Sequence, residues 1–273
     1  MYNNLRLKIK LMLNKLKKND SIFFILKNIQ YFLKFVIKKI ISFSGTEERL
    51  SKIESAMTYQ FKEEEFLWEK LCLNGQKYRK KIIEDILKNS KFDLILETGT
   101  EYGYTSKFLS QFCEKVITIE KSKPIYLIAR ENLKDNPKIK LILNDSKNIL
   151  NILGNEKNIV DSKIFFYLDA HSEGDYPLIE ELDYIVNNVK EFVILIDDFQ
   201  VPDDEGYGYD SFMGRKLNIK FIRDVIKQNF SFYFPSISSS EETGRLRGYI
   251  LITNIDSEKE KLDKIEELKR FIF

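Results

Sequence analysis

Residues 96–106 read LETGTEYGYTS, and this stretch decides the fold. It follows a short apolar run at residues 94–97 and precedes a helical pattern that continues to Phe112. Gly99 and Gly103 allow a tight turn and a close approach to a ligand, where a Cβ atom would collide. The helix that follows presents unpaired backbone N–H groups at its start. The stretch predicts a ligand-binding turn between a strand and a helix, and the alternative is such a turn without a ligand.

Short apolar runs alternate with helical patterns from Phe92 onwards, which predicts a parallel sheet covered on both faces. Two later runs, at 231–234 and 248–253, are joined only by the polar segment 236–247, so we expect antiparallel neighbours. A charged helix is expected from 257 to 270. The predicted fold is a Rossmann-like seven-stranded α/β sheet, with five parallel strands and a C-terminal antiparallel hairpin. The five parallel strands are expected at residues 94–97, 116–119, 139–143, 165–168 and 192–196.

Charge divides the chain into a basic start and an acidic remainder. Residues 1–45 hold ten Lys or Arg and one acid, a net charge of 10 − 1 = +9, and the remainder carries 34 − 41 = −7. We therefore expect a basic amphipathic helical arm at 1–45, a helical lead-in at 46–90 and the main domain at 91–273. An acidic body argues against nucleic acid as a partner.

The arm does not have the pattern of a membrane span, because lysines interrupt its apolar stretch before about 18 uncharged residues accumulate. Its apolar residues recur at helical spacing, which favours a helix lying on an anionic membrane or on a partner. The alternative is a helix docked on the acidic body. Cys72 and Cys113 fit no metal or disulfide spacing, which favours a reducing cytoplasm. The predicted location is cytoplasmic, with the arm at the inner face of the membrane.

Acidic residues follow the strand ends on the ligand side. Glu101 replaces the second glycine of a G-x-G-x-x-G motif, and an acidic loop suits a cationic sulfonium better than a pyrophosphate. Glu120 ends the second strand, where a carboxylate accepts hydrogen bonds from ribose hydroxyls. Asp145 and Ser146 end the third strand, where an adenine amino group would lie. The alternative for this pair is an ordinary helix cap.

Three more carboxylates end the fourth and fifth strands at the same edge. Asp169 ends the fourth strand, and Asp197 and Asp198 end the fifth. The three carboxylates would repel one another unless a positive charge lay between them, and an oxygen-ligated Mg²⁺ meets that need. In the alternative, Asp169 caps a helix and the other two contact cofactor or solvent.

These residues together resemble class I S-adenosylmethionine-dependent methyltransferases. Within that superfamily the chain is most similar to the metal-dependent macrocin O-methyltransferase and cephalosporin-type family, over about residues 76–253. The resemblance implies Mg²⁺ as a cofactor beside S-adenosylmethionine, with Asp169, Asp197 and Asp198 as its ligands. The residues that it assigns to the S-adenosylmethionine site are Glu97, Gly99, Thr100, Gly103, Ser106, Glu120, Asp145 and Ser146.

His171 is the only histidine, and it follows Asp169 by two residues. A histidine is the simplest general base near neutral pH, so His171 and Asp169 are the predicted catalytic residues; the alternative is a structural histidine. The related enzymes place one more residue between their Asp and His. The glycine-hinged, aromatic segment 199–210 is expected either to close over an acceptor or to be a surface loop.

The expected reaction is methyl transfer to a hydroxyl of a sugar or secondary metabolite, on a small-molecule or glycan acceptor. The other hypothesis is a membrane-associated nucleoside-binding protein on the same fold, without catalysis.

Overall fold

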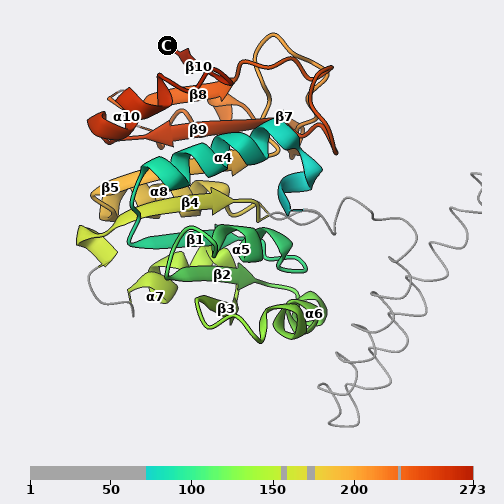
Figure 1. Cartoon of the computed structure of the whole chain (residues 1–273), viewed down its shortest axis with the longest axis vertical. Helices are drawn as coiled ribbons and strands as arrows, with labels where there is room; N and C mark the ends of the chain where they lie inside the picture. Colours follow the sequence, from blue (N-terminus) through green and yellow to red (C-terminus); the bar gives the residue numbers. More distant parts are fainter. Residues whose placement is uncertain (1–71, 155–158, 171–175, 227–228, 273) are drawn as a thin grey trace, which may run out of the picture. The chain divides into compact units, whose positions relative to one another are not determined.

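The computed structural model describes residues 72–154, 159–170, 176–226 and 229–272. Its main sheet has eight strands in the order β10-β8-β9-β5-β4-β1-β2-β3 (Figure 1). The first five strands in sequence run parallel, and the last three are antiparallel to their neighbours. The strands are β1 (Leu94–Thr98), β2 (Val116–Glu120), β3 (Ile139–Leu143), β4 (Lys163–Leu168), β5 (Glu191–Asp197), β8 (Ser231–Pro235), β9 (Tyr249–Thr253) and β10 (Leu268–Phe271).

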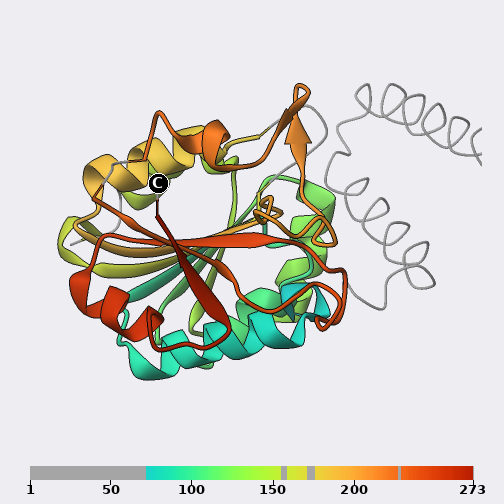
Figure 2. The same cartoon turned by 90° about the horizontal axis from the view of Figure 1, so that it is seen from above.

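Helices cover both faces of this sheet. Figure 2 shows the teal α4 and the red α10 on one face and the yellow α8 on the other. A small hairpin, β6 (Ser211–Phe212) with β7 (Arg215–Lys216), lies in the connection between β5 and β8. The helices are α4 (Lys77–Asn89), α5 (Tyr104–Leu109), α6 (Lys123–Leu133), α7 (Ile149–Leu153), α8 (Leu178–Asn188), α9 (Ile219–Ile222) and α10 (Asp256–Leu262), with short 3-10 turns η1 (Cys72–Gly75), η2 (Ser146–Asn148) and η3 (Ile159–Asp161).

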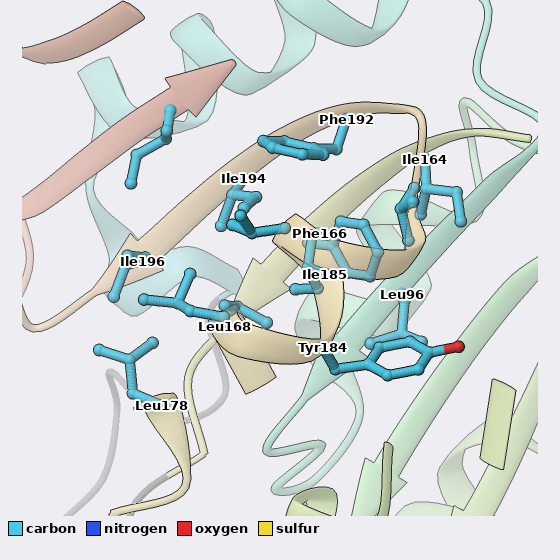
Figure 3. Packing of buried hydrophobic residues seen from close by; sticks show 14 of the residues in the cluster. Leu96, Ile164, Phe166, Leu168, Leu178, Tyr184, Ile185, Phe192, Ile194 and Ile196 are labelled. Atoms are coloured by element: carbon cyan, nitrogen blue, oxygen red, sulfur yellow. The ribbon is translucent and has the colours of Figure 1, made fainter. Parts of the chain in front are cut away.

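The central strands are apolar on both faces because each face is covered. Alternate residues enter two core clusters, as Leu96 faces α8 while Ile95 packs toward α4. Figure 3 shows the α8 side, where Phe166 and Ile194 lie against Ile185 of the helix. On the other side, α4 contributes a stripe of fully or almost fully buried residues, Ile82, Ile83 and Ile86. The predicted two-sided α/β fold is confirmed.

The C-terminus differs from the expected helix at 257–270. The helix α10 ends at Leu262, and β10 follows as an eighth strand paired with β8. Without it, β8 would form the sheet edge, and Phe271 of β10 packs its ring on Phe234, with centroids 5.5 Å apart. Covering an apolar edge strand outweighs the helical pattern of the charged residues.

The arm at 1–45 and most of the lead-in lie outside the described residues, so predictions about them stay predictions. Contacts divide the chain into Met1–Glu54 and Ser55–Phe273, and every described residue belongs to the second unit. Within the described ranges, no helix combines the length and the apolar character that crossing a membrane requires.

Candidate cofactor and active site

The loop after β1 lies at the edge where the parallel strands end. Its backbone is held by the neighbouring strand, because the N–H groups of Gly99 and Thr100 both donate to the Ile119 carbonyl, at 3.0 and 3.2 Å. Three residues adopt left-handed backbone angles: Gly99 and Gly103 at φ +82° and Glu101 at φ +49°. The loop therefore has a defined, partly strained conformation.

Both glycines are required by packing within the protein. A Cβ on Gly99 would lie 2.4 Å from the carbonyl oxygen of Asp169, which ends β4. A Cβ on Gly103 would lie 2.8 Å from the Leu133 side chain of α6. The expected tight turn is present, and its glycines are explained without a ligand, so they are not by themselves evidence of one.

Glu97 organises the interior of the loop. Its Oε2 accepts hydrogen bonds from the hydroxyls of Ser106 and Thr118, and the Thr118 hydroxyl also lies 2.6 Å from that of Thr100. Its Oε1 is buried and has no hydrogen-bond partner among the residues that the structure describes. Burial and, to a smaller extent, the charges of Glu120 and Glu101 raise the pKa of Glu97, the two hydrogen bonds oppose them, and the net pKa is about 7. Thr100 and Ser106, predicted as cofactor contacts, are engaged with this buried network.

Glu120 lies at the end of β2 beside the loop. Its Oε2 accepts from the backbone N–H of Glu101 at 3.1 Å, and its Oε1 accepts from that of Ser122 at 2.7 Å. The backbone N–H of Lys121 also bonds this carboxylate. A carboxylate has about four lone-pair positions, so one remains for a further donor. Burial raises the pKa of this carboxyl group, which indicates a desolvated position.

Asp145 caps a helix, as one interpretation of the sequence expected. Its Oδ1 accepts from the Lys147 N–H at 3.1 Å, and its Oδ2 pairs with Lys121 at 2.6 Å. Ser146 is buried and forms a hydrogen bond with Glu181 of α8. Burial raises the pKa of Glu181 to about 7. The adenine role of this pair stays a prediction, and Glu181 is a residue that the sequence did not point to.

Asp197 lies in a fully buried ion pair. Its Oδ2 accepts from Arg79 Nη1 at 2.7 Å, from the Tyr167 hydroxyl at 2.7 Å and from the Asn74 amide at 3.1 Å. Its Oδ1 accepts from the backbone N–H of Asp198 at 2.7 Å. Three donors thus fill Oδ2, and a fourth takes one of the two lone pairs of Oδ1.

Asp198 is paired with Arg247, whose guanidinium also bonds Asp210. Asp198 has a left-handed backbone at φ +55°, an unfavourable conformation for a residue with a Cβ atom. Burial raises its pKa, the charge of Asp197 raises it further, and Arg247 opposes both effects. The positive charge that the sequence required near these acids is therefore supplied, at least for Asp197 and Asp198, by arginines of the chain.

Asp169 is half-buried at the end of β4. Loss of solvation raises its pKa well above the ordinary value, and the charges of Asp197 and Asp198 raise it further. His171 lies outside the described residues, so its predicted role as a base stays a prediction. In the described ranges, no three His, Cys, Asp or Glu side chains are grouped to hold a metal ion. Asp197 does not fit as a Mg²⁺ ligand, because its charge is already balanced by Arg79 in a fully buried ion pair and its Oδ2 is filled by three donors. We therefore derive no step through a metal.

Comparison with known proteins identifies the fold. The chain is similar to an O-methyltransferase from Bacillus cereus in complex with S-adenosylhomocysteine, with 18% identity, 80% of this chain and 96% of that chain covered, and a TM-score of 0.50. It is also similar to the O-methyltransferase TomG from Streptomyces achromogenes in complex with S-adenosylmethionine, with 14% identity, 64% and 79% covered, and a TM-score of 0.49. No family model matches, and no curated protein gives a match. The chain therefore has the fold of a class I methyltransferase.

Sequence reasoning missed Arg79 and Arg247. Arginine is much the rarer basic residue in this lysine-rich chain, and its planar guanidinium suits buried pairs with carboxylates better than an ammonium does. That preference was the available signal. It does not say which arginine meets which acid, because Arg79 and Asp197 are 118 positions apart.

Replacing Gly99 tests the contact between the loop and β4. Gly99→Ala combines a left-handed backbone with a collision against the Asp169 carbonyl, so we expect it to lower the free energy of unfolding by at least about 3 kcal/mol. Gly214→Ala is the matched control, because it has φ +75° and nothing within 4 Å of the added Cβ. We expect a loss of about 1 kcal/mol there. Equal losses in chemical denaturation would show that the close approach is unimportant.

Proposed function

We propose that this protein transfers a methyl group from S-adenosylmethionine to a hydroxyl group, on a sugar or secondary-metabolite acceptor. The observation that carries the proposal is a set of desolvated acids, Glu97 and Glu120, at the loop end of a methyltransferase-like sheet. The S-adenosylhomocysteine bound in an O-methyltransferase of similar fold, which is the product of S-adenosylmethionine after methyl transfer, supports the choice of cofactor. The narrower likeness to the macrocin and cephalosporin-type family stays a prediction.

The charge at this edge suits a cationic nucleoside. Glu97 has a buried oxygen without a hydrogen-bond partner, and it feels the charges of Glu120 and Glu101. S-adenosylmethionine carries a sulfonium and an ammonium group, and its ribose offers two hydroxyl donors. Glu120 would accept a hydrogen bond from the ribose with its remaining lone pair, while the three acids Glu97, Glu101 and Glu120 favour the positive groups. A pyrophosphate would be repelled at the same place.

Removal of the hydroxyl proton is assigned to Asp169 and His171. The backbone carbonyl of Asp169 lies against Gly99, which places this residue beside the loop. Burial, with the neighbouring charges of Asp197 and Asp198, raises its pKa, and a carboxylate with a raised pKa is a stronger base. The bound cofactor supplies an electrophilic methyl group, and the residues of this chain align it and accept the proton.

Titration with S-adenosylmethionine and S-adenosylhomocysteine tests this proposal. Glu120→Ala should weaken the affinity for both by at least about tenfold, because it removes charged acceptors for the ribose. Glu114→Ala is the control, since that carboxylate is exposed and precedes the same strand. Calorimetry that detects no binding by the full chain would contradict the cofactor assignment. Binding without transfer of labelled methyl to any hydroxyl acceptor would favour the non-catalytic nucleoside-binding hypothesis.

The affinity for S-adenosylmethionine should depend on pH through Glu97. Its pKa is raised to about 7, so below that pH the carboxyl group is protonated and a cationic ligand must displace the proton. Affinity should rise by up to about tenfold per pH unit below 7 and level off above it. Glu97→Gln should flatten this dependence.

Glu258→Gln is the control, because Glu258 is an equally buried carboxyl group, and its partners Lys163, at the start of β4, and Lys261 of α10 lie away from the loop. The slope should persist in this variant. An unchanged slope in Glu97→Gln would remove Glu97 from the cofactor site.

A further inference from the structure

The loop between β5 and β6, residues 198–210, is closed at its base. Its first and last residues meet, since the Asp210 N–H donates to the Asp198 carbonyl at 2.8 Å. Their carboxylates are joined by one guanidinium: Arg247 bonds Asp198 through Nε and Asp210 through Nη2. One side chain from the segment before β9 thus ties both ends of the loop together.

Arg247 is itself held firmly. The Gln76 side-chain amide bonds both sides of its backbone, accepting from the Arg247 N–H at 2.8 Å and donating to its carbonyl at 3.0 Å. Arg79 donates to the same carbonyl. The two neighbours of Arg247 in the chain bond Gly208 of the loop: the Gly208 N–H donates to the Leu246 carbonyl at 2.7 Å, and the Gly248 N–H donates to the Gly208 carbonyl at 2.8 Å. The guanidinium therefore reaches the two acids from a fixed backbone.

The charges around the loop base are matched by these contacts. Asp197 and Asp198 are 1% and 6% exposed, so each needs a close cation. Arg79 forms an ion pair with Asp197, and Arg247 forms ion pairs with Asp198 and with the less buried Asp210. A divalent ion bridging two carboxylates would occupy the place that the Arg247 guanidinium holds, and it would have to expel that group against its backbone anchors.

We infer that Arg247 is the resident cation of this edge and the positioning residue of the β5–β6 loop. Its guanidinium joins the carboxylates of Asp198 and Asp210, as a bridging divalent metal would do, and so holds the two ends of the loop together. Loop closure is thereby independent of metal. This inference does not depend on the proposed methyl transfer, because its tests use the full chain without cofactor or acceptor.

Amide hydrogen exchange of residues 208–212 tests the role of Arg247. Arg247→Ala should raise the exchange rate there by at least about tenfold, because the two ion pairs that join Asp198 to Asp210 are lost. Arg245→Ala, an exposed arginine two residues earlier, should leave the rate unchanged. Amides of α8, on the opposite face, report whether the variant remains folded. Wild-type rates in a folded Arg247→Ala protein would overturn the proposal.

Asp210→Asn provides a milder variant in case Arg247→Ala does not fold. It weakens the ion pair between Arg247 and Asp210, the less buried of the two pairs, so we expect faster exchange confined to residues 208–212. Unchanged exchange in this variant would also count against the positioning role of Arg247.

Manganese binding tests the exclusion of metal. Titrated with Mn²⁺ and followed by the free-ion paramagnetic resonance signal, the wild-type chain should take up no ion at Asp198. A chelator should not change exchange at residues 208–212. The inference would be overturned if the wild type bound Mn²⁺ and Asp198→Asn abolished the binding, or if chelation opened the loop. Binding unaffected by Asp198→Asn would lie elsewhere and agree with the inference.

Discussion

The buried ion pair of Arg79 and Asp197 is the interaction on which this edge of the molecule depends. It joins α4 to the end of β5, and it draws in β4 through the Tyr167 hydroxyl and β9 through the Tyr249 ring, which lies 4.7 Å from the guanidinium carbon. The same arginine bonds the carbonyl of Arg247. Removing one partner of such a pair leaves an uncompensated buried charge and typically costs about 3–5 kcal/mol. The helix before the sheet is thus electrostatically part of the site.

Charge divides the carboxyl edge into two parts with different chemistry. Around β5, arginines neutralise the acids and fix the backbone, so those acids serve the structure. Around β1 and β2, Glu97 and Glu120 have no arginine among their described hydrogen-bond partners, and burial raises the pKa of both, that of Glu97 to about 7. A cationic ligand gains most where negative charge is desolvated and least balanced. The first part gives rigidity, and the second would give the proposed preference for S-adenosylmethionine.

The strand pattern predicted the parallel sheet well because fully buried strands need continuous apolar runs, and those runs depend on local sequence. The loop at Gly99 was also predictable, since only glycine tolerates that backbone and that proximity to Asp169. Long-range partners were not predictable. The sequence showed acids in need of a cation, and Mg²⁺ was a reasonable inference, yet Arg79 and Arg247 reach them from segments far along the chain. The strand at Leu268–Phe271 depended likewise on an exposed edge that only the folded sheet creates.

A crystal structure of the full chain with S-adenosylhomocysteine would test the central claim most directly. The account predicts the ribose hydroxyls on Glu120 and the amino-acid portion beside the loop of Gly99 to Gly103. Arg79 and Arg247 would keep their present carboxylate partners. An adenosyl group bound away from Glu120, or a ribose on the arginine-paired acids of β5, would contradict the assignment of the site.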